Sequence, residues 1–425
     1  MEQVIVNITV SAFYIIFIGF LSLKYSEIKL PILIGGAGRL VLSWLIGLRI
    51  LEIPGTTSDA VAFEQQAYEW SQLSWSNLIS TFDVGSSYVI STVGAIFYKV
   101  IYTSPVMLNI INAAISVWLI VLSFLLAKRL FGTSRGKAAA WIIALFPYAV
   151  LYGSVFRREA FGSVFLMLAL LAAVKWDARN NPALFALSLF FVLCAAVFHG
   201  GFLAAGIGLV LFSLLSLFLF FGKADARYRG NTVVSISMAL VFATGVVAYA
   251  VASGVNINTL GQLDSLNVAE SIEARVLHRV SEGGSSYPDF LRGVDPFANP
   301  FVLAGRLVYF LFSPFPWDIS APVHLLGFFA TVLFIAVFIS IYRSRKIILK
   351  TPKILMVAVM VFSCILVFGI SIDNVGTSIR HRTKFIYALV ALCGAPVFSR
   401  LRLRMSNHLY FPGRRAQLEH REPGS

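Results

Sequence analysis

Asp59 is the first residue of this chain whose type and setting could do chemistry. It lies in Pro54-Gly-Thr-Thr-Ser-Asp-Ala60, where a turn gives way to a helical pattern. A carboxylate held there could draw the proton from an acceptor hydroxyl, as a general base does. An acid in the first turn of a helix also interacts favourably with the helix dipole, and this simpler role stays open. Glu64 is kept as a binding candidate, although neither it nor Glu69 is one helical turn from Asp59.

Two adjacent arginines follow in Phe156-Arg-Arg-Glu159, between two apolar segments. The planar guanidinium groups of Arg157 and Arg158 suit a phosphate, which they can bind through two parallel hydrogen bonds. Glu159 could hold these groups in place as part of the same binding site. The alternative is a local ion pair between Glu159 and either arginine, which would contribute little.

A third group lies near the end of the chain, in Asp373-Asn-Val-Gly-Thr-Ser-Ile-Arg-His-Arg-Thr-Lys384. Arg380, Arg382 and Lys384 are three cations beside His381, and we expect them in a loop at the mouth of the last membrane helix. This composition predicts a clamp for a lipid phosphate or a pyrophosphate. Attraction to anionic head groups in general is the alternative.

Other polar residues carry weaker signals. His199 lies in a tight turn, Phe198-His-Gly-Gly201, and alone it is more simply structural, although it is kept as a binding candidate. Arg39 lies inside an apolar segment, where a charge is costly and should be paired or near water. The three cysteines fall in apolar runs and form no metal motif. No cofactor is indicated with certainty; a divalent metal is compatible with the sequence but is not indicated by it.

The elements that position these residues are membrane helices. The chain has 425 residues, of which 58% are hydrophobic and only 13% are charged. Val106–Ala127, Gly201–Gly222 and Pro322–Tyr342 are uncharged for about 20 residues, the length that crosses a bilayer as a helix. Backbone groups in lipid must be satisfied internally, and these runs lack the alternation of a barrel strand. The fold class is therefore all-α, a polytopic integral membrane protein.

Hydrophobic runs of this kind predict about eleven membrane helices. They cover residues 4–23, 31–50, 105–127, 138–155, 160–174, 182–198, 202–222, 232–253, 322–342, 354–372 and 385–399. We expect a single transmembrane domain over 1–399, with long outer loops at 51–104 and 254–321. A basic cytoplasmic tail follows at 400–425.

Charge distribution predicts the orientation. When connections are assigned alternately to two sides, one side holds 22 Lys and Arg and the other 10, whereas acids divide 5 to 15. Basic residues collect on the cytoplasmic side, so the N-terminus is expected outside and the C-terminus inside the cell inner (plasma) membrane. The net charge of +14 then reflects orientation and not nucleic acid binding. The cytoplasmic connections contain no GxxxxGK[ST] or GxGxxG motif.

The outer loops contain helical patterns of their own. Thr56–Ser80 has apolar residues at helical intervals behind a plausible N-cap at Thr57 or Ser58, and predicts a helix on the membrane surface. Tyr88–Tyr102 is similar. Leu260–Glu282 is expected to be partly helical, and Phe301–Phe312 predicts a short re-entrant or surface helix that ends at a proline-rich corner.

The chain resembles the GT-C superfamily of membrane glycosyltransferases, which use polyprenyl-phosphate sugars. The resemblance covers most of the chain and depends on loose motifs in a specific order. They are Asp59, Ala95-Ile-Phe-Tyr98, Pro105, Asn109, Ala127-Lys-Arg-Leu-Phe-Gly132, Ala144-Leu-Phe-Pro147, Tyr152-Gly-Ser, Arg158-Glu159 and Asn374-Val-Gly-Thr-Ser-Ile-Arg-His-Arg382. Many members have a second acid beside the catalytic one, whereas Ala60 follows Asp59 here.

The resemblance implies that Asp59 is the catalytic carboxylate and that Arg158, Arg380 and Arg382 hold the carrier's phosphate. The implied activity is transfer of a sugar from an undecaprenyl-phosphate-type carrier to a glycan or lipid-linked acceptor at the outer face. An oligosaccharide-repeat polymerase of O-antigen or exopolysaccharide synthesis is the nearest alternative. A lipid-linked saccharide flippase or transporter is the contrasting one, and it should place ionisable groups near mid-membrane. The expected partners are membrane lipids, the lipid-linked donor and the acceptor, with no nucleic acid.

Overall fold

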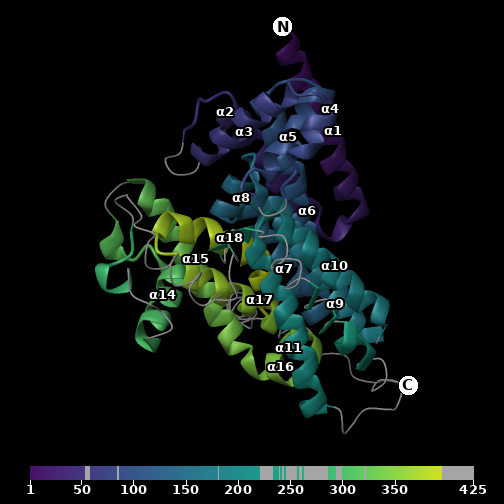
Figure 1. Ribbon diagram of the computed structural model, residues 1–425, viewed down its shortest axis with the longest axis vertical. Helices are drawn as coiled ribbons and strands as arrows, with labels where there is room; N and C mark the ends of the chain where they lie inside the picture. The colour runs from purple at the N-terminus through teal and green to yellow at the C-terminus, as the bar shows by residue number, and fades with distance from the viewer. Residues whose placement is uncertain are drawn as a thin grey trace, which may run out of the picture.

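The computed structural model describes the chain from residue 1 to residue 394 with gaps (Figure 1). The described residues are 1–52, 58–83, 86–179, 181–220, 233–238, 240–241, 244–245, 256–257, 261–262, 286–292, 299–319 and 322–394. Four predicted features lie outside these residues or their described side chains: the basic tail, the N-cap at Thr57 or Ser58, most of the helix at 232–253 and most of the partly helical stretch at Leu260–Glu282. Of that last stretch only Gly261–Gln262 is described, and it is a strand.

Almost all described elements are helices. In the first half they are α1 (Glu2–Lys24), α2 (Lys29–Gly47), α3 (Ser58–Ser71), α4 (Trp75–Ser80), α5 (Val89–Val100), α6 (Pro105–Phe131), α7 (Thr133–Leu145), α8 (Pro147–Gly153) and α9 (Arg158–Arg179). In the second half they are α10 (Pro182–Phe198), α11 (Leu203–Phe220), α14 (Pro300–Phe312), α15 (Pro322–Arg343), α16 (Arg345–Lys350), α17 (Pro352–Ser371) and α18 (Val375–Leu392). The strands β1 (Asn256–Ile257) and β2 (Gly261–Gln262) form one short antiparallel pair.

Six helices in the described part of the chain are long and apolar enough to cross a membrane, and a bent pair raises the number to seven. The six lie at Glu2–Lys24, Ser26–Gly47, Pro105–Phe131, Arg158–Asp177, His324–Arg343 and Pro352–Ser371. α10 and α11 are apolar but shorter. The first helix turns large apolar side chains outward, Phe13, Ile16 and Phe20 among them, as a lipid-facing helix does. The chain is therefore a polytopic helical membrane protein.

Two predicted boundaries differ from the structure. The helix expected over 138–155 is two helices, α7 and α8, bent by 63°. The bend falls at Pro147, which has no backbone N–H to donate and disfavours helix in the residue before it. The last helix, expected over 385–399, instead begins at Val375. Asn374 caps it, because its side-chain oxygen accepts a hydrogen bond from the Thr377 N–H at 3.1 Å.

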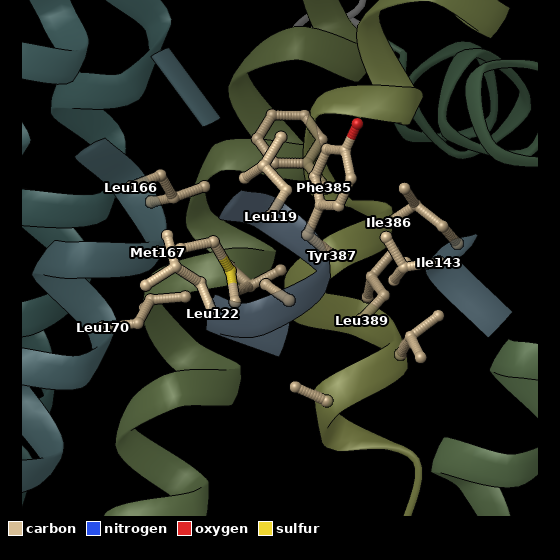
Figure 2. Packing of buried hydrophobic residues seen from close by; sticks show 14 of the residues in the cluster. Leu119, Leu122, Ile143, Leu166, Met167, Leu170, Phe385, Ile386, Tyr387 and Leu389 are labelled. Atoms are coloured by element: carbon tan, nitrogen blue, oxygen red, sulfur yellow. The ribbon is translucent and has the colours of Figure 1, made fainter. Parts of the chain in front are cut away.

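The centre of the molecule is formed by α6 and α18, which pack on each other and on α7 and α9. Figure 2 shows Leu119 and Leu122 of α6 against Phe385, Tyr387 and Leu389 of α18, with side chains of α7 and α9 around them. Tyr387, Phe385 and Leu389 are almost fully buried. The second half of α18 is therefore anchored in the core, directly after the turns that carry its charged side chains.

A second, smaller hydrophobic cluster holds the first outer loop. Phe63 and Ala67 of α3 pack against α5, and the Ser91 hydroxyl donates to the Phe63 carbonyl at 2.8 Å. Phe156, directly before the paired arginines, joins the same cluster. In Figure 1, α3, α4 and α5 lie together beside α1 at the N-terminal end of the molecule. α3 is thereby placed over the turn that contains Arg157.

Several basic turns meet at another place in the fold. Lys128, at the end of α6, pairs with Glu27 in the turn between α1 and α2. Lys353, at the start of α17, donates to the Arg129 carbonyl at 2.9 Å. Three connections that we assigned to the basic side therefore lie next to one another, as one side of a membrane domain requires.

Candidate functional site: a cluster of buried charges

The candidate site begins at the turn between α8 and α9. Two asparagines of α6 hold this turn in place through hydrogen bonds. The Asn109 side-chain oxygen accepts from the Phe156 N–H at 2.8 Å, and the Asn112 amide donates to the carbonyls of Tyr152 and Gly153. A β-carbon at Gly153 would collide with Ser116 Oγ, so only glycine allows this approach of α8 to α6. The turn is thus fixed to the core, and it presents Arg157 and Arg158.

Sequence reasoning assigned no role to these asparagines. The signal was available, because two amide side chains within one apolar membrane helix must find partners there. Their partners here are the backbone groups of the turn, so they position the site.

Arg157 and Arg380 both bind the carboxylate of Asp59. Nη2 of Arg157 lies 2.9 Å from Oδ2 of Asp59, and Nη1 of Arg380 donates to the same oxygen. Arg157 is wholly buried and also lies over the ring of Tyr152, 5.5 Å from its centroid. Tertiary structure therefore joins three segments that are about 100 and 220 residues apart in the sequence.

Glu159 is the second carboxylate of the site. Its Oε1 lies 3.4 Å from Nε of Arg380, and its Oε2 lies 3.9 Å from Nε of Arg157. The local pair that we considered between Arg157 and Glu159 is thus present, but Glu159 also contacts Arg380 from another helix. The side chain of Glu159 is 8% exposed, whereas that of Asp59 is 44% exposed. One acid lies inside the site and the other at its edge.

Helical spacing places three residues of α18 on this site. Lys384 is four residues from Arg380 and three from His381, and residues at these spacings are neighbours on the surface of a helix. Nζ of Lys384 lies 3.4 Å from Nδ1 of His381 and over the rings of Phe368 and Phe202. Lys384 is also within electrostatic reach of Glu159.

His199 contacts this face from the turn after α10. Its ring packs edge-on against His381, with centroids 5.0 Å apart, and against Phe368 at 4.6 Å. Burial and the positive charge of Lys384 lower the pKa of His199 well below its usual range. We therefore expect a neutral imidazole at neutral pH. Its Nδ1 also accepts from the Gly201 N–H, so a structural role is part of what it does.

Arg382 lies away from these residues, which differs from our expectation of a joint clamp with Arg380. Two residues along a helix correspond to about 200° of rotation, so the two side chains leave α18 on opposite faces. Arg382 donates to the Leu311 carbonyl at 2.7 Å and to Thr331 Oγ1 at 2.8 Å, and lies over the Phe334 ring. The error came from expecting a loop over these residues, in which the side chains could converge.

Glu64 also lies outside the cluster. The Tyr98 hydroxyl donates to its Oε1 at 3.1 Å, and Arg49 lies 3.9 Å from its Oε2. Burial raises the pKa of Glu64, although Tyr98 and Arg49 act in the opposite direction. Glu69 is exposed and accepts from Gln66, as a residue on a solvated face can.

The charges of the cluster do not balance. We define the cation cluster as Arg157, Arg158, Arg380 and Lys384 with the carboxylates of Asp59 and Glu159. By formal charge, four cations face two anions, although burial and the neighbouring arginines lower the pKa of Lys384 well below its usual range, so its positive charge is the one most easily lost. Several buried N–H groups of these arginines make no hydrogen bond among the described residues: Nε and Nη1 of Arg157, Nη1 of Arg158 and Nε of Arg380. The two Nε groups lie within ion-pair distance of Glu159, whereas the two Nη1 groups have no such partner. Buried charged donors are costly when unpaired, so this arrangement favours an added anion.

The described residues contain no group of three or more His, Cys, Asp or Glu side chains that could hold a metal ion. Comparison with protein-family models finds none that matches the chain, and comparison with curated proteins finds no significant match. The resemblance to GT-C glycosyltransferases therefore stays a prediction, and the site must be interpreted from its own geometry.

Proposed function

We propose that the protein is a membrane glycosyltransferase whose cation cluster binds the phosphate of a polyprenyl-type lipid carrier. The observation that carries the proposal is the formal excess of cations over carboxylates in the cluster, beside Nη1 groups of Arg157 and Arg158 that have no hydrogen-bond partner among the described residues. Phosphate oxygens are the acceptors that such groups bind best. The cluster lies at the N-terminal end of the membrane span Arg158–Asp177, a suitable depth for the phosphate of a lipid whose chain stays in the bilayer.

The chemistry of transfer assigns a separate role to each part of the site. A hydroxyl of the acceptor gives its proton to the Asp59 carboxylate as its oxygen forms a bond to the anomeric carbon of the sugar. The bond from that carbon to the carrier phosphate breaks, and the electron pair stays on the phosphate oxygen. Arg157, Arg158 and Arg380 stabilise the negative charge that develops there. Asp59 is suited to meet an acceptor, because its side chain is half-exposed.

Orientation follows the distribution of charge. We propose that the basic connections face the cytoplasm. Among them are the turns that contact one another through Glu27 and Lys128 and through Lys353 and Arg129. The cation cluster then faces outward, and the N-terminus is extracytoplasmic. Truncation fusions to a reporter that is active only in the cytoplasm test this. The reporter should be active after Lys137 and inactive after Thr103; the reverse pattern would invert the proposed topology.

A repeat-unit polymerase is the second candidate, because a specific feature favours a diphosphate carrier. With Lys384 protonated, as an anion bound beside it would favour, the excess of two positive charges equals the charge of a diphosphate diester, whereas a monophosphate diester carries one negative charge. The two candidates share the cation cluster and differ in the donor.

Mass spectrometry of lipid-linked saccharides in a deletion strain tests the proposal. A polyprenyl-linked saccharide should accumulate and should disappear when the wild-type gene is restored. One sugar on a monophosphate supports the monosaccharide transferase, and an oligosaccharide on a diphosphate supports the polymerase. Lipid-linked saccharides that match the parent strain in kind and amount would rule out both.

A further inference from the structure

Asp59 occupies the place where the cation cluster would bind a phosphate. A single carboxylate oxygen, Oδ2, receives N–H groups from Arg157, in the turn before α9, and from Arg380 of α18. Two guanidinium groups that converge on one oxygen are arranged for an oxyanion. In this structure the oxyanion is supplied by the chain itself.

An external anion would reach the cluster at Asp59. The side chains of Asp59 and Arg380 are 44% and 20% exposed, whereas Arg157, Arg158 and Lys384 are buried. A phosphate entering beside Arg380 therefore approaches the Asp59 carboxylate at close range. At about 4 Å two like charges repel by about 4 kcal/mol in the environment of a protein surface. The phosphate and the carboxylate cannot share the same pair of arginines without a large loss of binding energy.

Of the two acids in the cluster, Asp59 is the one that can move. Glu159 is 8% exposed and lies at the start of α9, between Arg157 and Arg380. Asp59 lies in the first turn of α3, and its carboxylate can return to water by rotating its side chain. α3 itself is held elsewhere, by the packing of Phe63 and Ala67 and by the hydrogen bond from Ser91. Release of the Asp59 side chain therefore leaves the helix in place.

We propose that Asp59 is an internal competitor for the donor's phosphate, and that donor binding releases its carboxylate to act as the base. The proposal rests on the function proposed above and adds an order to it. Before the donor binds, two guanidinium groups occupy Oδ2 of Asp59, so this oxygen is not open to an acceptor hydroxyl. Once the phosphate takes these groups, the carboxylate is free at the exposed edge of the site. The base is thus available only when a donor is present.

Binding of a simple prenyl phosphate tests the competition. Farnesyl phosphate is titrated into the full-length protein in mild detergent, with farnesol as the uncharged control. Asp59→Asn and Asp59→Ser should each bind farnesyl phosphate at least about tenfold more tightly than wild type, because the competing charge is gone. Asp59→Glu keeps the charge and should stay within about threefold of wild type. Glu69→Gln removes an acid from an exposed position of α3 and should leave the affinity unchanged.

The outcomes separate this inference from the proposed function. Arg380→Ala should weaken binding of farnesyl phosphate and leave that of farnesol unchanged. If it does so while both charge-removing variants of Asp59 bind with wild-type or lower affinity, competition by Asp59 is excluded and the phosphate site stands. If Arg380→Ala binds farnesyl phosphate like wild type, the phosphate site fails, and the inference with it. Two charge-removing variants are used so that one poorly folded protein does not decide the result.

Discussion

Arginine is buried at two kinds of place in this protein, and the difference separates structure from function. Arg39 is fully buried, and its N–H groups donate to Ser116 Oγ and to the carbonyls of Gly35, Ile143 and Ala149. Arg382 is satisfied in the same way by neutral oxygen atoms. Such arginines join helices through dipoles and leave no demand for a further anion.

The arginines of the cation cluster are different, because they face one another. Arg157, Arg158 and Arg380 share two carboxylates with Lys384, and several of their N–H groups have no hydrogen-bond partner among the described residues. Buried like charges are unfavourable unless opposite charges, such as those of a bound anion, compensate for them. Burial alone therefore does not mark a functional arginine; the identity of its partners does.

The largest effect is expected when Asp59, the proposed base, loses its ability to accept a proton. Asp59→Asn keeps the size of the side chain but should lower turnover by about 10²–10⁴-fold, the contribution of a positioned base. Single-turnover assays of purified protein with a lipid-linked donor measure this. Wild-type turnover in folded Asp59→Asn would remove Asp59 from catalysis, whereas loss of folding would favour the helix-dipole role.

Arg39→Ala should affect stability and not binding. It removes a hydrogen-bond donor from buried oxygen atoms of three other segments, so the free energy of unfolding should fall by about 2–4 kcal/mol. Denaturant unfolding in mild detergent measures the loss. The folded fraction of this variant should bind the donor with wild-type affinity. Weaker binding by the folded fraction would contradict the assignment of Arg39 to a purely structural role.

Arg380 and Arg382 form the sharpest matched pair, because they are two residues apart on one helix. Arg380→Ala should weaken donor binding by about 1.5–3 kcal/mol, as expected for loss of a charge-assisted hydrogen bond. Lys at this position should restore it only in part, since it lacks the bidentate fork. Arg382→Ala should leave donor affinity unchanged and lower stability instead. Titration of both variants with the donor shows whether the helical face of an arginine, or only its position in the sequence, determines its role in binding.

The smallest effect is expected at Glu64, the acid of α3 that lies outside the cluster. In Glu64→Gln the amide oxygen can still accept from Tyr98, so turnover should stay within about a factor of three of wild type. The same single-turnover assay as for Asp59→Asn provides the comparison. A loss near that of Asp59→Asn would extend the site along α3 toward Tyr98 and Arg49.

Much of the helical framework is readable from the chain. Uncharged runs such as Val106–Ala127 have only one way to satisfy their backbone in lipid, and α6 forms there. The start of α6 follows from Ser104 and Pro105, because Ser accepts from the Met107 N–H and proline suits the first turn. Residue types also indicated where chemistry could occur, since adjacent arginines outside a basic connection need an anion.

Only the tertiary structure decided which of those residues meet. Asn374 begins α18 early, and the helical rotation then sends Arg380 into the cluster and Arg382 out of it. The ion pairs of Asp59 depend on how α3 packs against α5 and on the turn that Asn109 holds, and these contacts join segments far apart in the chain. Residue types and local periodicity can be read along the chain. The charge balance of a site, in contrast, depends on which residues are neighbours in space.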